Sequence, residues 1–241
     1  MRRRTLATAV VALAVAVGGA AGCGGDSSSD DTTTEATTAA TTAPATTAPS
    51  TTAPGTSGGG TTAPATKLTA ADLPPADAIA GVGKGTPRTI DSASKFVDVL
   101  YQDGDPAKPA AVTRLENAGY RTAILRDQAG TDAETGIALL RTYAIAMGSE
   151  EAAKQEVSDA IEEVRNASAA QTSDIDTRIP DGQGLRVDID QGGVTGAVIF
   201  VTFPVGSTVY GIQAVATSAG NLNEDEILTA ARDLATQAAN R

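Results

Sequence analysis

The spacing of apolar side chains divides the chain at about residue 68. No large apolar side chain occurs between Gly24 and Lys67, whereas apolar residues recur at helical or strand spacing from Leu68 to the C-terminus. A segment without large apolar side chains cannot offset the entropy lost on ordering. The pattern therefore predicts one folded domain over residues 68–241, which is long enough to bury a sizeable core.

Four segments of this domain carry apolar residues at helical spacing. The predicted helices cover about 92–102 and 106–118, with a third beginning after Ser149 and a fourth beginning after Asn223. Serine and asparagine are preferred helix N-caps because their side chains accept a hydrogen bond from the first free backbone N–H groups. Asn223 is followed three residues later by a glutamate, the spacing of a capping box.

Five segments favour strands. They are residues 120–126, 137–147, 185–190, 198–203 and 209–216, which are separated by turn residues or by helices. Because several consecutive strands are joined by short turns, we expect an α+β domain. In it an antiparallel sheet of about five strands is packed by helices, in the order α-α-β-β-α-β-β-β-α.

Two other segments of the domain are interpreted as loops. The Gly-rich stretch 80–89 lacks the spacing of a phosphate-binding loop, and the polar stretch 168–177 has no apolar alternation. Arg141 interrupts the apolar positions of the strand 137–147. We expect it to pair with an acid, to line a pocket, or to lie where the strand leaves the core.

The N-terminus has the three parts of a bacterial export signal. Arg2, Arg3 and Arg4 precede the apolar stretch Leu6–Val17, and small residues follow. The apolar stretch is shorter than the roughly 20 residues of a transmembrane helix. Residues 1–22 are therefore interpreted as a signal peptide that is removed after export.

The residues Ala20-Ala21-Gly22-Cys23 resemble the lipobox of bacterial lipoproteins, with alanine where leucine is common. The resemblance implies cleavage before Cys23, acyl chains such as palmitate on that cysteine, and attachment to the extracytoplasmic face of the cell membrane. The alternative is an ordinary secreted protein in which Cys23 has no such role. Two or more acyl chains would hold the protein stably at a bilayer.

Residues 23–67 are expected to form a disordered tether behind the lipid anchor. Between Thr32 and Thr66, 28 of 35 residues are Thr, Ala or Pro, and the unit Thr-Thr-Ala-Pro occurs four times. This composition is typical of a solvated spacer. An O-glycosylated Thr-rich segment is the alternative.

Composition narrows the chemistry of the domain. The chain has no histidine and a single cysteine, so histidine-based catalytic triads, disulfides within the chain and cysteine-ligated zinc are excluded. The net charge is −11, and loss of three arginines with the signal peptide would leave −14. So acidic a protein has no electrostatic support for binding nucleic acid.

Acidic pairs are the remaining candidates for a site. Asp188 and Asp190 project from one face of a predicted strand and are the candidate ligands for a Ca²⁺ ion, against the alternative of a solvated edge. The ordered pattern of a calcium-binding loop is missing around them. We therefore expect no metal, no cofactor and no catalytic residue.

The predicted order of elements is similar to that of PsbP-like domains and of uncharacterised lipoprotein domains from actinobacteria. This resemblance rests on topology and carries over no functional residue. The expected function is a non-enzymatic binding or interaction module, with an apolar patch or groove on the sheet and an envelope protein or lipid as partner. The alternative is a carrier of lipid or another small molecule. Its cavity of several hundred cubic ångströms would be left by small side chains: Ala144, Ala146, Ala197, Gly211 and Ala214. A hydrolase that uses paired carboxylates is the third hypothesis.

Overall fold

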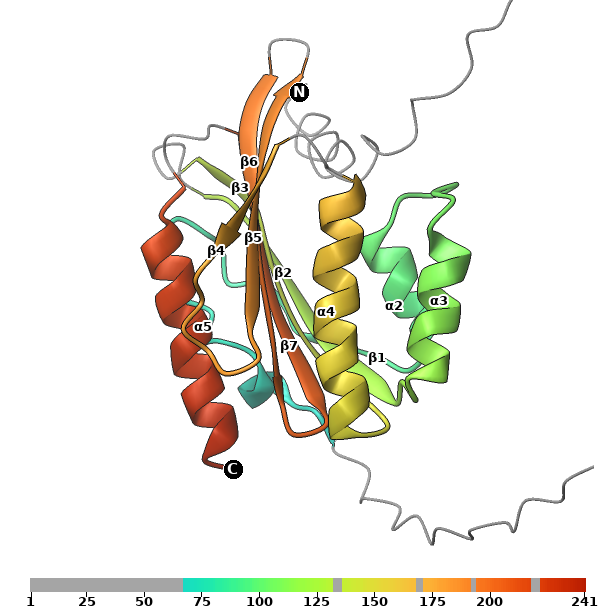
Figure 1. Ribbon diagram of the computed structural model, residues 1–241. Coiled ribbons are helices and arrows are strands. Elements are labelled where there is room, and N and C mark those ends of the chain that lie inside the picture. The colour runs from blue at the N-terminus through green and yellow to red at the C-terminus, as the bar shows by residue number, and fades with distance from the viewer. Residues whose placement is uncertain (1–66, 132–135, 168–170, 192–193, 218–221) are drawn as a thin grey trace, which may run out of the picture. The chain divides into compact units, whose positions relative to one another are not determined.

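The computed structural model describes residues 67–131, 136–167, 171–191, 194–217 and 222–241. They form one antiparallel sheet with helices on both of its faces (Figure 1). The strands are β1 (Arg88–Ile90), β2 (Thr122–Ala129), β3 (Ile137–Ala146), β4 (Thr172–Ile175), β5 (Gln183–Gln191), β6 (Val194–Val205) and β7 (Thr208–Ala216). The helices are a short 3₁₀ turn η1 (Ala70–Asp72), α2 (Ala93–Leu100), α3 (Lys108–Asn117), α4 (Glu150–Ala167) and α5 (Glu224–Ala239).

The prediction of about five strands was wrong: the described sheet has seven, in the order β1-β2-β3-β7-β6-β5-β4. The two strands that were missed, β1 and β4, lie at the two edges of the sheet. They are three and four residues long, and most of their side chains are exposed or half-exposed. A short edge strand has one partner and little apolar burial, so the alternation that reveals a strand in a sequence is absent.

The five longer strands and the helix caps were predicted correctly in kind. Ser149 accepts a hydrogen bond from the backbone N–H of Ala152 at 3.1 Å, and Asn223 accepts one from that of Glu226 at 3.3 Å. The Glu226 side chain differs from the expected capping box, because it accepts a hydrogen bond from the N–H of Ala80. Residues 192–193, which lie between two of the predicted strands, are outside the described residues.

Helices cover both faces of the sheet (Figure 1). On one face, α2, α3 and α4 pack on alternate residues of the strands, including Tyr143, Ile145 and Val209. On the other face, α5 and the segment that begins at Leu68 pack on the remaining residues. Every residue of β7 is buried as a result. Strand β3 is likewise buried from both sides, although its sequence indicated one apolar face interrupted by Arg141.

The small residues of the sheet serve close packing. Ala144, Ala146, Ala197 and Ala214 are at most 1 % exposed and belong to the core cluster shared with α5. Short side chains at these positions let α5 pack against the sheet, and the four alanines lie within the core that they share with this helix. Gly211 has a different role, which is described below.

Candidate functional site

A cavity of about 120 Å³ lies between the sheet and the layer formed by α2, α3 and α4. We call it the helix–sheet cavity. Its helical walls are largely apolar and include Leu100 of α2, Leu115 of α3, and Ile161 and Val164 of α4. Its floor is formed by strands β3, β6 and β7.

Aromatic side chains are concentrated around this cavity. Four of the seven aromatic residues of the chain line it: Phe96, Tyr101, Tyr143 and Phe200. The rings of Phe96 and Tyr143 meet edge to face, with their centroids 5.6 Å apart and an interplanar angle of 71°. Such a geometry is favourable because the positive edge of one ring faces the negative face of the other. These residues come from separate elements, so no local pattern in the sequence predicts the cluster.

Gly211 makes room for one of these rings. It lies on β7 directly opposite Tyr143 of β3. A Cβ atom at residue 211 would lie 2.0 Å from Cζ of Tyr143, so the tyrosine ring occupies the place where a side chain would stand. The glycine thus lets the ring lie across the neighbouring strand and line the cavity.

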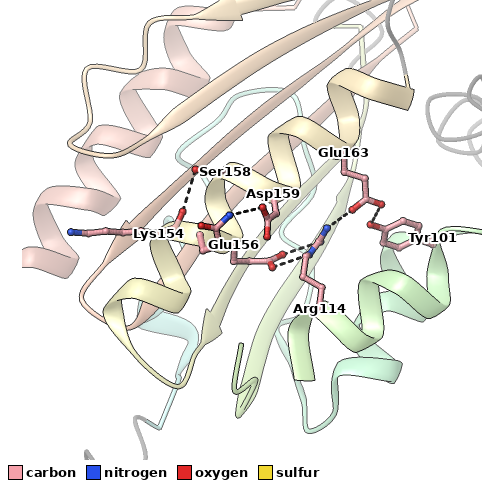
Figure 2. Close-up of polar contacts among 8 residues, drawn as sticks. Tyr101, Arg114, Lys154, Glu156, Ser158, Asp159 and Glu163 are labelled. Carbon is pink, nitrogen blue, oxygen red and sulfur yellow. Dashed lines mark hydrogen bonds and ion pairs between the residues drawn. The ribbon is translucent and has the colours of Figure 1, made fainter. Parts of the chain in front are cut away.

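One wall of the cavity is polar and carries a chain of hydrogen bonds and ion pairs (Figure 2). Arg114 of α3 donates to both oxygens of Glu156 through Nε and Nη2, each at 3.1 Å. Its Nη1 donates to Glu163 at 2.6 Å, and the hydroxyl of Tyr101 donates to the other oxygen of Glu163. The two glutamates are seven residues apart on α4, so they lie on the same face of that helix two turns apart.

Burial dominates the electrostatics of this wall. Glu156 is 5 % exposed, and the loss of hydration raises its pKa to about 7, although Arg114 acts in the opposite direction. Burial alone would lower the pKa of Arg114, but the two carboxylates hold it above its ordinary value. Burial, together with the hydrogen bond to Glu163, also raises the pKa of Tyr101, which stays a neutral donor.

The wall therefore has more negative than positive charge when its acids are ionised. Two carboxylates share one guanidinium, and three of the five N–H groups of Arg114 donate to them. A carboxylate has about four acceptor positions. Each of the four glutamate oxygens receives one of the hydrogen bonds described, so capacity for further donors remains.

Little in the sequence indicates that these polar residues lie together. Glu156 lies beside the predicted apolar stripe of its helix, between Ala153 and Val157, and a charge next to that stripe was the one available signal. Arg114 is 42 and 49 residues away from its two partners along the chain. No local pattern connects residues at such separations.

The candidate calcium ligands lie elsewhere. Asp188 and Asp190 are exposed on β5, and neither lines the helix–sheet cavity. Asp188 accepts a hydrogen bond from Arg186 at 2.8 Å. Over the described ranges, no group of three or more acidic or cysteine residues is placed to hold a metal ion. Cys23, the predicted site of lipidation, lies outside the described residues.

Arg141 pairs with an acid, which is one of the three roles considered for it. Its Nε donates to Asp127 at 2.7 Å, and Asp127 also binds Arg88 at 3.0 Å. Its Nη1 is buried and has no hydrogen-bond partner within the described part of the chain. Arg141 does not line the helix–sheet cavity.

Two further hollows lie beside α5. One, of about 640 Å³, is bordered by Asp77, Asp225, Glu226 and Asp233, and the other, of about 540 Å³, lies between α5 and Pro180. Both are more open to solvent than the helix–sheet cavity. The described residues also contain no helix that is long and apolar enough to cross a membrane.

Comparison with known proteins found similarity to a solved structure but no matching family. No protein-family model matches the chain, and no curated protein matches it. Among solved structures, the chain is similar to the extracellular domain of PknH from Mycobacterium tuberculosis, with a TM-score of 0.41 and 13 % sequence identity. The similarity covers 65 % of this chain and 81 % of that domain. At this score and identity we draw no function or residue role from it.

Proposed function

We propose that the protein is an extracytoplasmic lipoprotein whose folded domain is a non-enzymatic binding module for a small, largely apolar molecule. The helix–sheet cavity carries this proposal: it has apolar helical walls, an aromatic lining and one polar wall. Ligand sites are commonly lined in this way, mostly by apolar and aromatic residues with a few polar groups that orient the ligand.

The size of the cavity limits the ligand. Its volume of about 120 Å³ is below the range of about 300–1,000 Å³ typical of sites for drug-sized ligands. A dry cavity of about 150 Å³ in another protein holds a benzene molecule. The part of the ligand that enters is therefore about the size of one ring or a short branched chain, which disfavours a carrier that encloses a whole lipid.

The polar wall supports binding over catalysis. Glu156 and Glu163 both bind Arg114, so each carboxylate is held as a hydrogen-bond acceptor. Histidine, the most common general base, is missing from the sequence.

The binding proposal is tested with benzyl alcohol, a neutral probe of suitable size. We expect it to raise the melting temperature of the full chain in a saturable manner, because a ligand at 100 times its Kd stabilises a fold by about 2.7 kcal/mol. Ala160 lines the cavity, so Ala160→Phe should fill it and abolish the shift. The matched control is Glu162→Phe, two residues further on the exposed face of α4. A shift that survives Ala160→Phe would place binding elsewhere and refute the proposal.

The lipid anchor is proposed from the sequence around Cys23. Removal of the acylated side chain in Cys23→Ala should leave an uncleaved precursor or release the protein from the membrane. Fractionation of cells, with the mass of the N-terminal peptide, measures both outcomes. A Cys23→Ala protein that is still cleaved before residue 23 and still sediments with membranes would contradict the anchor.

A further inference from the structure

We infer that the helix–sheet cavity selects small organic cations, in which an ammonium group is attached to an apolar body, over neutral and anionic molecules of the same shape. This inference rests on the proposed binding function and names the class of ligand. Three features of the cavity carry it: the excess of carboxylates in its wall, the binding of its one arginine by both of them, and its aromatic lining.

The first feature is charge. The wall contains Glu156 and Glu163 but a single cation, Arg114. Their side chains are 6 %, 27 % and 26 % exposed, so solvent screens them weakly. In a cavity of low dielectric constant, an unbalanced negative charge attracts a ligand cation more strongly than it would in water.

The second feature, the binding of Arg114 by both glutamates, disfavours an anionic ligand. An anionic ligand would need donors from Arg114, but three of its five N–H groups, one on each nitrogen, already donate to glutamate oxygens. An anion on the remaining N–H groups would lie close to two carboxylates that repel it, and displacement of Glu156 or Glu163 would leave a carboxylate without its partner. A cation, in contrast, adds N–H donors to carboxylate oxygens that have acceptor positions to spare.

The third feature is the aromatic lining. Phe96, Tyr101, Tyr143 and Phe200 surround the cavity, and the face of an aromatic ring attracts a nearby cation through its quadrupole. Tyr101 belongs to both the aromatic lining and the charged wall, because its ring lines the cavity and its hydroxyl donates to Glu163. Rings and carboxylates together would stabilise an ammonium group while the rings accommodate its apolar body.

The test compares three probes of one shape: benzylammonium, benzyl alcohol and benzoate. Each is titrated into the full chain in a nonionic detergent at pH 8, and Kd is measured by calorimetry. We expect benzylammonium to bind at least about tenfold more tightly than benzyl alcohol, as one cation–π contact or ion pair of moderate strength would give. Benzoate should bind most weakly of the three.

Variants of α4 separate the site from general attraction to an acidic protein. Glu163→Gln keeps the shape of the side chain and should reduce the preference for benzylammonium to within about threefold, while benzyl alcohol still binds. The matched control is Glu162→Gln, which removes the same charge from the adjacent, exposed position and should keep the full preference.

The outcomes distinguish the two proposals. Equal affinity for benzylammonium and benzyl alcohol, with both blocked by Ala160→Phe, would overturn the cation selectivity and leave the binding function standing. A preference that falls equally in Glu162→Gln and Glu163→Gln would also overturn it, because only net charge would then matter. Failure of all three probes to bind would refute the proposed function itself.

Discussion

Substitution of Gly211 by alanine probes the aromatic lining of the cavity directly. The added Cβ atom would lie 2.0 Å from Cζ and 2.4 Å from the hydroxyl oxygen of Tyr143, closer than any real contact. The tyrosine ring must therefore leave its place on β7. Because Tyr143 already lines the cavity, we expect the displaced ring to move into that space.

The expected cost follows from two opposing terms. An extra methyl group in a packed core typically destabilises by about 1–3 kcal/mol. Replacement of a strand glycine by alanine otherwise stabilises by about 0.5–1 kcal/mol, since the unfolded chain loses freedom. We predict that Gly211→Ala loses about 1–2 kcal/mol of unfolding free energy, measured by urea denaturation, together with binding of a probe in the cavity.

A second variant identifies the cause of the loss. In a Tyr143→Val background the ring is gone, so Gly211→Ala should cost nothing or should stabilise, and the double-mutant cycle should show coupling of at least about 1 kcal/mol. Gly83→Ala is the control for glycine replacement, because its added Cβ would meet other atoms only at 3.5 Å or more. A Gly211→Ala protein as stable as the unmodified chain would refute the proposed contact with Tyr143.

Two further predictions concern buried charges. The folded pKa of Glu156, about 7, lies above its ordinary value of 4.5, so the folded state binds the extra proton and this group should make the protein more stable as the pH falls from 8 to 5. The gain in unfolding free energy, measured by urea denaturation, is on the order of 3 kcal/mol. Glu156→Gln should remove this pH dependence, whereas Glu162→Gln should keep it. An unchanged pH dependence in Glu156→Gln would assign it to other groups. The other charged and titratable groups near Glu156 are Tyr101, Arg114, Tyr143, Asp159 and Glu163. Arg141→Met should change the unfolding free energy by less than about 1 kcal/mol, because Asp127 is 32 % exposed and keeps Arg88, so that no unpaired buried charge is left. A loss above about 3 kcal/mol would show that the pair is essential.

The parts of the fold that the sequence predicted are those specified by local patterns. The caps at Ser149 and Asn223 and the long strands β3, β6 and β7 each follow from residues close together in the chain. The edge strands β1 and β4 were missed because they bury too little to alternate. Their place in the sheet depends on partners that only the folded chain supplies.

The candidate site was missed for a related reason. Its lining residues extend from Phe96 to Gln213 and come from three helices and three strands. Each looks ordinary in its own segment: a tyrosine after a helix, an arginine on an exposed face, a glutamate beside an apolar stripe. Of the five small residues that suggested a cavity, the four alanines belong to the core on the opposite face, where α5 packs on the sheet.

The pairing of β3 with β7 at the centre of the sheet also sets an order of folding. Strands β4 to β7 pair with their neighbours in sequence, but Ala146 of β3 pairs with Thr208 of β7, across 62 positions of the chain. Hairpins of adjacent strands form within microseconds, whereas a long-range pairing waits for the closure of the intervening loop. A chain delivered with its N-terminus first would present β3 with an open, largely apolar edge until β7 has followed. The central pairing is thus the last to become possible, and the time before it closes is the interval in which the emerging chain is most exposed to aggregation.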